Sequence, residues 1–297
     1  MPMHSRRQDY PTALRALPRR DLMIGTALTI LLASQATSRS APSRDPSRII
    51  IGGTGMALAT MRRIAAAFVT GEPGVTVDVL PSLGTGGGLS AATAGAIDVA
   101  LSARQLNDAE RAKGLQSHPY ACTPMAFVTP PATAIDGITL ADVAAIFAGT
   151  MTTWPDGTGI RLIRREPSDA DWSMLRGVSE AMAQVVEIAL RRPGLLTVAT
   201  DQENGDALER LRGSFGAMSI GQLRAEARRL KPLALDGVMP SVEAISRGRY
   251  KLSRTLYAVW RAAARPEITR FLAFLRSEQT VDLLATLGHI PLSGSDA

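Results

Sequence analysis

The chain has 297 residues, of which 45% are hydrophobic and 20% charged, so its composition is that of a globular protein with one large core or two moderate ones. Its net charge is +6, but residues 1–36 carry a surplus of three positive charges. The remaining +3 is too small for the basic surface of a nucleic-acid-binding protein. A single cysteine excludes an internal disulfide, and three histidines are too few for a histidine-rich metal site.

The amino-terminal segment has the features of an export signal. Arg19 and Arg20 stand directly before the apolar run 22–33, and small residues follow at 34–36. This order resembles a twin-arginine signal, so residues 1–36 are predicted to be cleaved and the rest to be periplasmic. The apolar run is shorter than the roughly 20 residues that span a bilayer. An amphipathic helix of a cytosolic protein is the alternative interpretation.

After a Ser/Pro/Arg-rich linker at 37–47, strands and helices alternate along the chain. Strands are predicted at 48–51, 75–80 and 97–102, and helices at 57–70 and 89–96. Further strands are predicted at 119–129, 162–165, 195–199, 215–220 and 255–261, and further helices at 139–147, 171–192 with a break near Gly177, 207–211, 240–247, 266–277 and 280–287. This order predicts an α/β fold with a largely parallel sheet, whose ligands bind at the carboxyl ends of strands.

Two glycine-rich turns follow the first two predicted strands, at 52–56 and 84–88. Neither has the spacing of a dinucleotide fingerprint or of a phosphate-binding P-loop. A helix that starts behind such a turn presents free backbone N–H groups and the positive end of its dipole, so the pair predicts a site for an electron-rich group. The alternative is that the glycines only permit tight turns.

Several short stretches, in order, resemble the phosphate-binding proteins of ABC transporters. They include Gly53-Thr54-Gly55, Gly84-Thr85-Gly86-Gly87-Gly88, Ala96-Ile97-Asp98-Val99-Ala100, Leu140-Ala141-Asp142-Val143, Phe215-Gly216-Ala217-Met218 and Leu287-Gly288-His289-Ile290-Pro291-Leu292. The resemblance implies a two-lobed periplasmic-binding-protein fold, in which each lobe is a mostly parallel sheet flanked by helices. It implies a first lobe of residues 48–127 plus 254–297 and a second lobe of 128–253, joined by two hinge crossings near Val128 and Leu256.

The resemblance also implies a binding cleft between the lobes. The residues expected to contact a ligand are Thr54, Gly55, Met56, Thr85, Gly86, Arg104, Arg165, Asp169, Asp171 and Asn204. Arg165 falls at the phosphate-gripping arginine of the family, and Asn204 belongs to a polar cluster at 200–204 that could instead cap a helix. Cys122 is expected to be a buried structural thiol, because it lies in an apolar stretch.

The expected oxyanion pocket departs from the family at one turn. Where the family shows Ser-Gly-Thr, this chain has Asp169-Ala170-Asp171. A carboxylate near a bound phosphate dianion is repulsive unless a proton or a cation lies between them. The alternative is structural, since Ser168 and Asp171 fit a capping box at a helix start. The substitution predicts a ligand that carries a proton donor, an amine or a bridging cation in preference to orthophosphate.

The sequence therefore predicts an exported, monomeric solute-binding receptor that closes two lobes around a small oxyanion-bearing solute and delivers it to an ABC permease. No cofactor, metal or nucleic acid is expected, and no catalytic group is required. The alternative function is a sensor or scaffold with the same fold. A hydrolase that uses Arg165, Asp169 and Asp171 with a metal is a third and weaker possibility, because a carboxylate pair alone is poor evidence for catalysis.

Overall fold

The structure is a computed structural model that describes residues 47–292. The predicted export signal at 1–36 and all of the predicted linker except Ser47 lie outside the described residues. Between residues 47 and 292, no helix is both long enough and apolar enough to cross a membrane.

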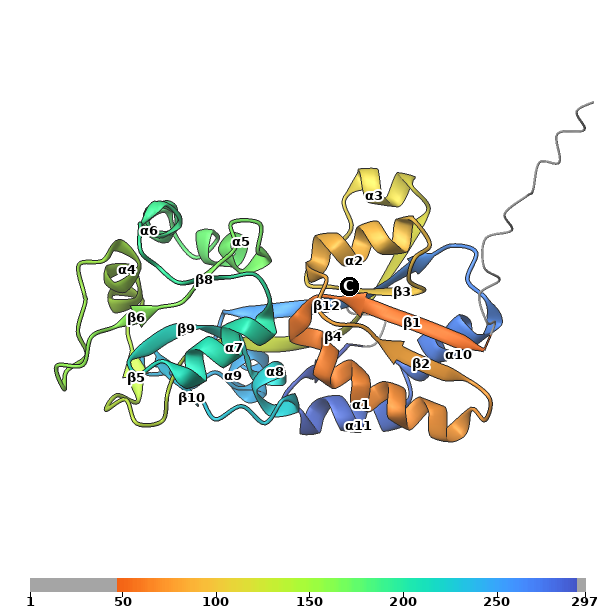
Figure 1. The fold of residues 1–297 in the computed structure, drawn as a ribbon. Helices are drawn as coiled ribbons and strands as arrows, with labels where there is room; N and C mark the ends of the chain where they lie inside the picture. Colours follow the sequence, from red (N-terminus) through yellow and green to blue (C-terminus); the bar gives the residue numbers. More distant parts are fainter. Residues whose placement is uncertain (1–46, 293–297) are drawn as a thin grey trace, which may run out of the picture. The chain divides into compact units, whose positions relative to one another are not determined.

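The first three strands are parallel neighbours and run in the order β2-β1-β3. They are β1 (Arg48–Gly53), β2 (Thr76–Val79) and β3 (Val99–Ser102). Helix α1 (Gly55–Gly71) connects β1 to β2, and α2 (Gly84–Thr93) connects β2 to β3, so both helices start at the carboxyl edge of the sheet. Figure 1 shows α1 on one face of these strands and α2 on the other.

Both helices begin inside the predicted glycine turns. Helix α2 was expected to start at Leu89 and starts instead at Gly84. Close packing explains the glycine at position 88, because a Cβ atom there would lie 2.7 Å from the Cα of Gly53. The low helix propensity of glycine hid this start in the sequence.

Two long antiparallel strands form the middle of the sheet. Strand β4 (Leu115–Thr129) pairs with β12 (Ser253–Arg261) along the whole length of β12, from Ser253 opposite Pro124 to Arg261 opposite Leu115. Strand β12 also pairs with β3, and the far end of β4 pairs with β9 (Ser214–Ser219). These two strands therefore connect the elements of the two predicted lobes, as the expected hinge crossings require.

The remaining strands are short. Strand β6 (Arg161–Leu162) runs parallel to β9, while β7 (Arg164–Arg165) runs parallel to β8 (Thr197–Val198) in a separate sheet, so the predicted strand at 162–165 is divided. The others are β5 (Gly137–Ile138), β10 (Lys231–Pro232), β11 (Ala234–Leu235) and β13 (Ile290–Pro291). Parallel pairing within the predicted lobes and flanking helices confirm the expected α/β class. The exact lobe boundaries stay a prediction.

The other helices follow the predicted order, with two short additions, α3 and α8. They are α3 (Asp108–Ala112), α4 (Leu140–Ala148), α5 (Ala170–Arg176), α6 (Glu180–Arg191), α7 (Asp201–Arg210), α8 (Ile220–Ala225), α9 (Val242–Ser246), α10 (Pro266–Phe274) and α11 (Glu278–Thr286). The break near Gly177 separates α5 from α6. Helix α7 begins six residues earlier than predicted, so the polar cluster at 200–204 forms its first turn.

The core is built from aromatic and branched side chains of both predicted lobes. Phe127 of β4 stacks on Phe215 of β9 with ring centroids 5.4 Å apart, and Phe68 of α1 meets Phe271 of α10 edge to face at 5.2 Å. Cys122, expected to be buried, is only partly buried on β4. It lies between β12 and β13, opposite Thr255 and Ile290.

Candidate functional site

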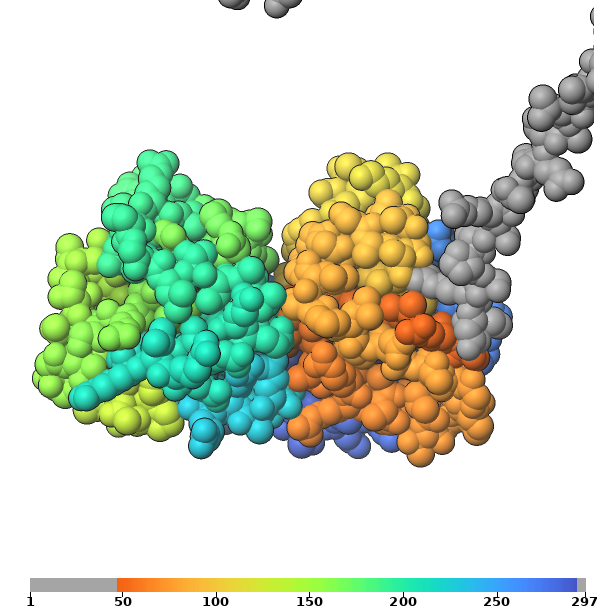
Figure 2. Space-filling model, viewed as in Figure 1, coloured from red at the N-terminus to blue at the C-terminus, as the bar shows by residue number. Residues whose placement is uncertain are grey.

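A cavity of about 720 Å³ lies where the starts of α1, α2, α5 and α7 converge. In Figure 2 the surface is hollowed between the orange residues of α2 and the green residues of α5. The lining comes from both predicted lobes and comprises Thr54, Met56, residues 82–87, Ala103, Arg104, residues 165–170, Ser173, Arg176, residues 199–201 and Arg254. Seven of the ten residues predicted to contact a ligand are in this lining: Thr54, Met56, Thr85, Gly86, Arg104, Arg165 and Asp169.

The start of α2 forms one wall of the cavity. Thr85 and Gly86 lie in the first turn, whose backbone N–H groups have no partner within the helix. The Thr85 hydroxyl oxygen accepts a hydrogen bond from the backbone N–H of Ala103 at 3.1 Å, which leaves its proton for a ligand. A Cβ at Gly86 would meet nothing within 4 Å, so this turn is open to the cavity.

Arg104 lies beside that turn and is already paired with a carboxylate. Its Nη1 and Nη2 donate to Glu110 at 2.9 and 2.8 Å, and Glu110 also completes the capping box of α3. The hydrogen bond from Arg104 holds the pKa of Glu110 below its usual range, so the pair stays ionised.

Arg165, on the opposite wall, is buried and held by its own lobe. Its Nε and Nη2 donate to one oxygen of Asp169, at 3.0 and 2.6 Å, and Nη1 donates to the backbone carbonyl of Thr200. Nη2 also donates to Asp201 at 3.3 Å. Every nitrogen of the predicted anion-gripping guanidinium therefore has a partner within the chain.

Asp171 lies behind the cavity wall and not in it. Arg254 of β12 donates to Asp171 Oδ1 at 3.0 Å and to the carbonyl of Ala170 at 2.8 Å, which ties α5 to the crossing strand. Burial raises the pKa of Asp171, the charge of Asp169 raises it further, and Arg254 and Arg165 oppose the rise. The Nε of Arg254 is buried and has no hydrogen-bond partner among the described residues.

Asp201, the first residue of α7, reaches across to the start of α1. Its carboxylate lies against the backbone of Gly55, where a Cβ would lie 2.6 Å from Asp201 Oδ2. Burial raises the pKa of Asp201 to about 7, and the charges of Asp169 and Asp171 act in the same direction. Arg165 and the Met56 N–H oppose that rise.

The charges of the cavity are balanced by the chain itself. All four arginines in the lining have a carboxylate partner: Arg104 with Glu110, Arg165 with Asp169, Arg176 with Glu187 and Arg254 with Asp171. Within residues 47–292, no cluster of His, Cys, Asp or Glu side chains is arranged to hold a metal ion. A ligand therefore meets arginines whose positive charge is already neutralised.

Three predicted residues lie outside the lining. Gly55 contacts Asp201 and Gln202 with its backbone, and Asp171 is one layer deeper, against Arg254. Asn204 is buried in α7, where its Nδ2 donates to the carbonyl of Ala217 on β9 at 2.9 Å. The first turn of α7 forms a capping box between Thr200 and Glu203, so the polar cluster at 200–204 caps this helix, as the alternative interpretation expected.

Other site residues were missed in the sequence. Asp201 was visible only as a member of the polar cluster, and Arg254 only as the residue before the predicted strand at 255–261. Asp169 caps α5 by accepting from the N–H of Asp171 at 2.8 Å, so the cap begins at Asp169 and not at Ser168 as the predicted capping box required.

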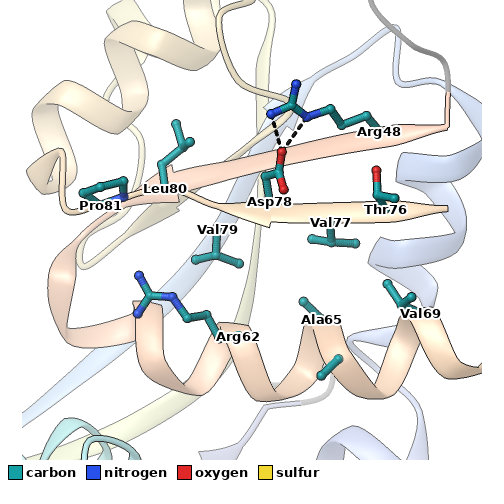
Figure 3. A pocket seen from close by; sticks show the side chains of 11 residues that line it. Arg48, Arg62, Ala65, Val69, Thr76, Val77, Asp78, Val79, Leu80 and Pro81 are labelled. Carbon is teal, nitrogen blue, oxygen red and sulfur yellow. Dashed lines mark hydrogen bonds and ion pairs between the residues drawn. The ribbon is translucent and has the colours of Figure 1, made fainter.

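A second hollow, of about 830 Å³, lies between edge strand β2 and α1, and its lining ends at Pro81, next to Ser82 of the first cavity. Figure 3 shows apolar side chains of both elements around it, with an ion pair between Arg48 and Asp78 at one rim. None of the predicted ligand-contacting residues lines this groove, so it does not compete with the first cavity as the candidate site.

Comparison with known proteins gives a family and a fold. The sequence model of a family described as the PBP superfamily domain matches residues 36–279. A phosphate-binding protein, PstS, of Borreliella burgdorferi is 23% identical over 203 residues, which covers 65% of this chain and 71% of the relative.

Solved structures agree on the fold. A putative phosphate ABC transporter substrate-binding protein from Clostridium perfringens, solved with bound phosphate, aligns with a TM-score of 0.70 at 20% identity over 83% of this chain and 100% of that one. An ABC-type phosphate transport receptor from Vibrio cholerae aligns with a TM-score of 0.58 at 21% identity, over 82% and 99% of the two chains.

Proposed function

The chain belongs to the PBP superfamily and is homologous to phosphate-binding proteins, and from this premise we propose that it is an exported solute-binding receptor of a phosphate-type ABC transporter. It captures a small oxyanion-bearing solute in the cavity between its predicted lobes and presents that solute to a membrane permease. Closure rotates the lobes about β4 and β12, near Val128 and Leu256, and binding shifts the equilibrium toward the closed state. Capture requires neither a catalytic group nor a second subunit.

The pairing of every lining arginine with a carboxylate carries the proposal for the ligand class. The oxyanion group of the solute has hydrogen-bond donors at the start of α2, where Thr85 and Gly86 face the cavity. On the opposite wall it meets Asp169 and Asp201, which repel a second negative charge. The solute therefore carries a proton donor or a cationic group in addition to its oxyanion.

A thermal-shift screen of the purified protein tests this function. The panel contains inorganic oxyanions, phosphonates, amino-bearing oxyanions, amino acids and divalent metals, because a ligand that binds only the folded state raises the melting temperature by mass action. The expected result is a concentration-dependent rise for an oxyanion that also carries an amine or a proton donor. A protein that responds to none of these solutes is not a receptor for them.

A sensor or scaffold is the second candidate. The two predicted lobes contact each other directly: Gln202 Nε2 donates to the carbonyl of Gly55 at 3.1 Å, and Arg63 Nη2 donates to the carbonyl of Ala225 at 3.1 Å. A sensor could report the state of this contact to a partner. Genes for a permease and an ATPase beside the gene for this chain favour transport, and their absence together with an empty screen favours the scaffold.

A further inference from the structure

We propose that Arg176 is the arginine with which the cavity binds the oxyanion of its solute, because it is the lining arginine that its carboxylate partner releases most easily. The inference rests on the proposed function, since it concerns the same cavity. It assigns the positive group to the last turn of α5 and not to Arg165, the residue that the family resemblance implies.

Two of the four lining arginines are held in buried ion pairs. Arg165 pairs with Asp169 and Arg254 pairs with Asp171, and none of these four side chains is more than 16% exposed. Freeing either arginine would leave a buried carboxylate without its cation, which strongly destabilises a protein. A solute that bound through either guanidinium would therefore lose much of its affinity to that penalty.

Arg104 is more exposed, but several hydrogen bonds hold it. Its guanidinium donates to both oxygens of Glu110 and to the backbone carbonyl of Gln105 at 2.9 Å. The side chain of Glu110 is only 17% exposed and also accepts from the N–H of Asn107, as part of the capping box of α3. Turning Arg104 toward a solute would break all three of its hydrogen bonds.

Of the four lining arginines, Arg176 is the one whose carboxylate partner is also well exposed. Its side chain is 37% exposed, and that of Glu187 on α6 is 46% exposed. Nε and Nη2 of Arg176 donate to the same oxygen of Glu187, at 3.0 and 2.7 Å, while Nη1 makes no hydrogen bond within residues 47–292. Exposed ion pairs of this kind contribute little to stability. An anion can therefore replace Glu187 at Arg176 with a small penalty.

Glu187 keeps a cation nearby when Arg176 leaves it. Arg191, one turn further along α6, places its Nη2 3.9 Å from the second oxygen of Glu187. The carboxylate is also open to water, which solvates its charge. Arg176 can therefore exchange Glu187 for an anionic solute without leaving a buried charge unpaired.

Ser173 supplies a second donor on the same face of α5. It lies three residues before Arg176, so the two side chains are neighbours on the helix surface, and both line the cavity. Thr85 and Gly86 line the same cavity from α2, in the other predicted lobe. An oxyanion held at the start of α2 is thus met by Arg176 and Ser173 when the lobes close.

Calorimetric titration at low ionic strength, where exposed charges are least screened, tests the role of Arg176. The probes are inorganic phosphate and aminomethylphosphonate, an oxyanion that carries an amine. Arg176→Gln removes the guanidinium, and Glu187→Gln removes the charge that competes for it. The matched controls are Arg247→Gln and Glu243→Gln, because these residues form a surface ion pair at α9 outside the cavity lining. Melting curves check that each variant is folded.

Arg176→Gln is expected to bind the better probe at least about tenfold more weakly than the wild type, the loss expected for a hydrogen bond to a charged group. Glu187→Gln is expected to bind it more tightly, because Arg176 is no longer neutralised, and both controls bind as the wild type does. If the pair only holds α5 against α6, both substitutions weaken binding. That result, unchanged affinities, or a Glu187→Gln variant that binds neither probe overturns the proposal.

The outcome separates this inference from the proposed function. If the wild type responds to a solute in the thermal-shift screen and the two substitutions do not act in opposite directions, the receptor function stands and the role of Arg176 falls. If the wild type responds to no solute, but Glu187→Gln binds a probe and the double variant Arg176→Gln/Glu187→Gln does not, the role of Arg176 stands and the receptor function falls.

Discussion

Asp169 accepts two hydrogen bonds from the guanidinium of Arg165, at 3.0 Å from Nε and 2.6 Å from Nη2, and so neutralises the arginine that the family resemblance assigns to the ligand. The two residues are four positions apart, and the pair is nearly buried, with 7% of the Arg165 side chain and 16% of the Asp169 side chain exposed. Buried ion pairs of this kind have large effects when one partner is removed.

Replacing Arg165 with Gln is expected to destabilise the protein by about 3–5 kcal/mol at pH 8, because Asp169 and Asp201 lose the cation between them. The loss is smaller near pH 5, where Asp201 is protonated and needs no counter-ion. Urea unfolding at the two pH values measures the difference. Arg191→Gln is the control, because the Arg191 side chain is 83% exposed, and an equal loss in the two variants contradicts the prediction.

The stability of the protein is expected to depend on Asp201 through pH. The pKa of Asp201 is raised to about 7 by burial, whereas in the unfolded chain it is about 4. The folded state therefore binds the proton more tightly, so the contribution of this group is fully present below about pH 4 and is lost as the pH rises to about 7. Asp171, with its raised pKa, adds to the same trend.

Melting temperatures between pH 4 and pH 8 check this dependence by comparing the wild type with Asp201→Asn. Asn does not titrate, so the variant is expected to lose less stability than the wild type as the pH rises through this window. If the difference between the two proteins is constant with pH, Asp201 does not titrate in the way described.

Gly55→Ala is expected to destabilise the protein by about 1–3 kcal/mol through overpacking. The new methyl group would come 2.6 Å from Asp201 Oδ2 and 2.7 Å from Gln202 Oε1, and would push α7 away from α1. Gly86→Ala provides the matched comparison, because it also lies in the first turn of a helix and a Cβ there meets nothing within 4 Å. If Gly86→Ala melts at a lower temperature than Gly55→Ala, the contact between position 55 and Asp201 is not a tight one.

Thr85→Val is expected to weaken the binding of whichever solute gives the largest thermal shift. Valine keeps the shape of threonine but removes the hydroxyl that accepts from the N–H of Ala103 and faces the cavity. The net loss of about 1 kcal/mol that one hydrogen bond contributes corresponds to a several-fold weaker affinity. Thr93→Val at the other end of α2, where the hydroxyl only donates to the carbonyl of Leu89, is expected to bind as the wild type does.

Much of the fold followed from local patterns in the sequence. The alternation of strands and helices from Arg48 to Ser102 was predictable because each element has its own hydrophobic period, and the break at Gly177 was predictable from a glycine between two helical patterns. The start of α2 at Gly84 was not, because glycine is a poor helix former, and the reasons for the glycines lie in the fold: Gly84 has a φ of +66° and Gly88 packs against Gly53.

The candidate site was less predictable than the fold. Thr85, Arg104 and Arg165 could be placed because they follow recognisable strands, but their partners could not. Asp201 comes against Gly55 only after the chain has folded, and no local pattern relates the two. Asn204 was chosen from the same polar cluster, yet Asp201 lines the cavity, whereas Asn204, about one turn further along α7, donates to the carbonyl of Ala217.

A crystal structure of the protein with the solute that gives the largest thermal shift is the decisive measurement. The solute is expected to lie in the cavity, with its oxyanion group at Thr85 and Gly86 and with Asp201 still beside Gly55 and Arg165. A solute whose anion binds Arg165 and the start of α1, with Asp201 displaced, contradicts the proposed position of the ligand.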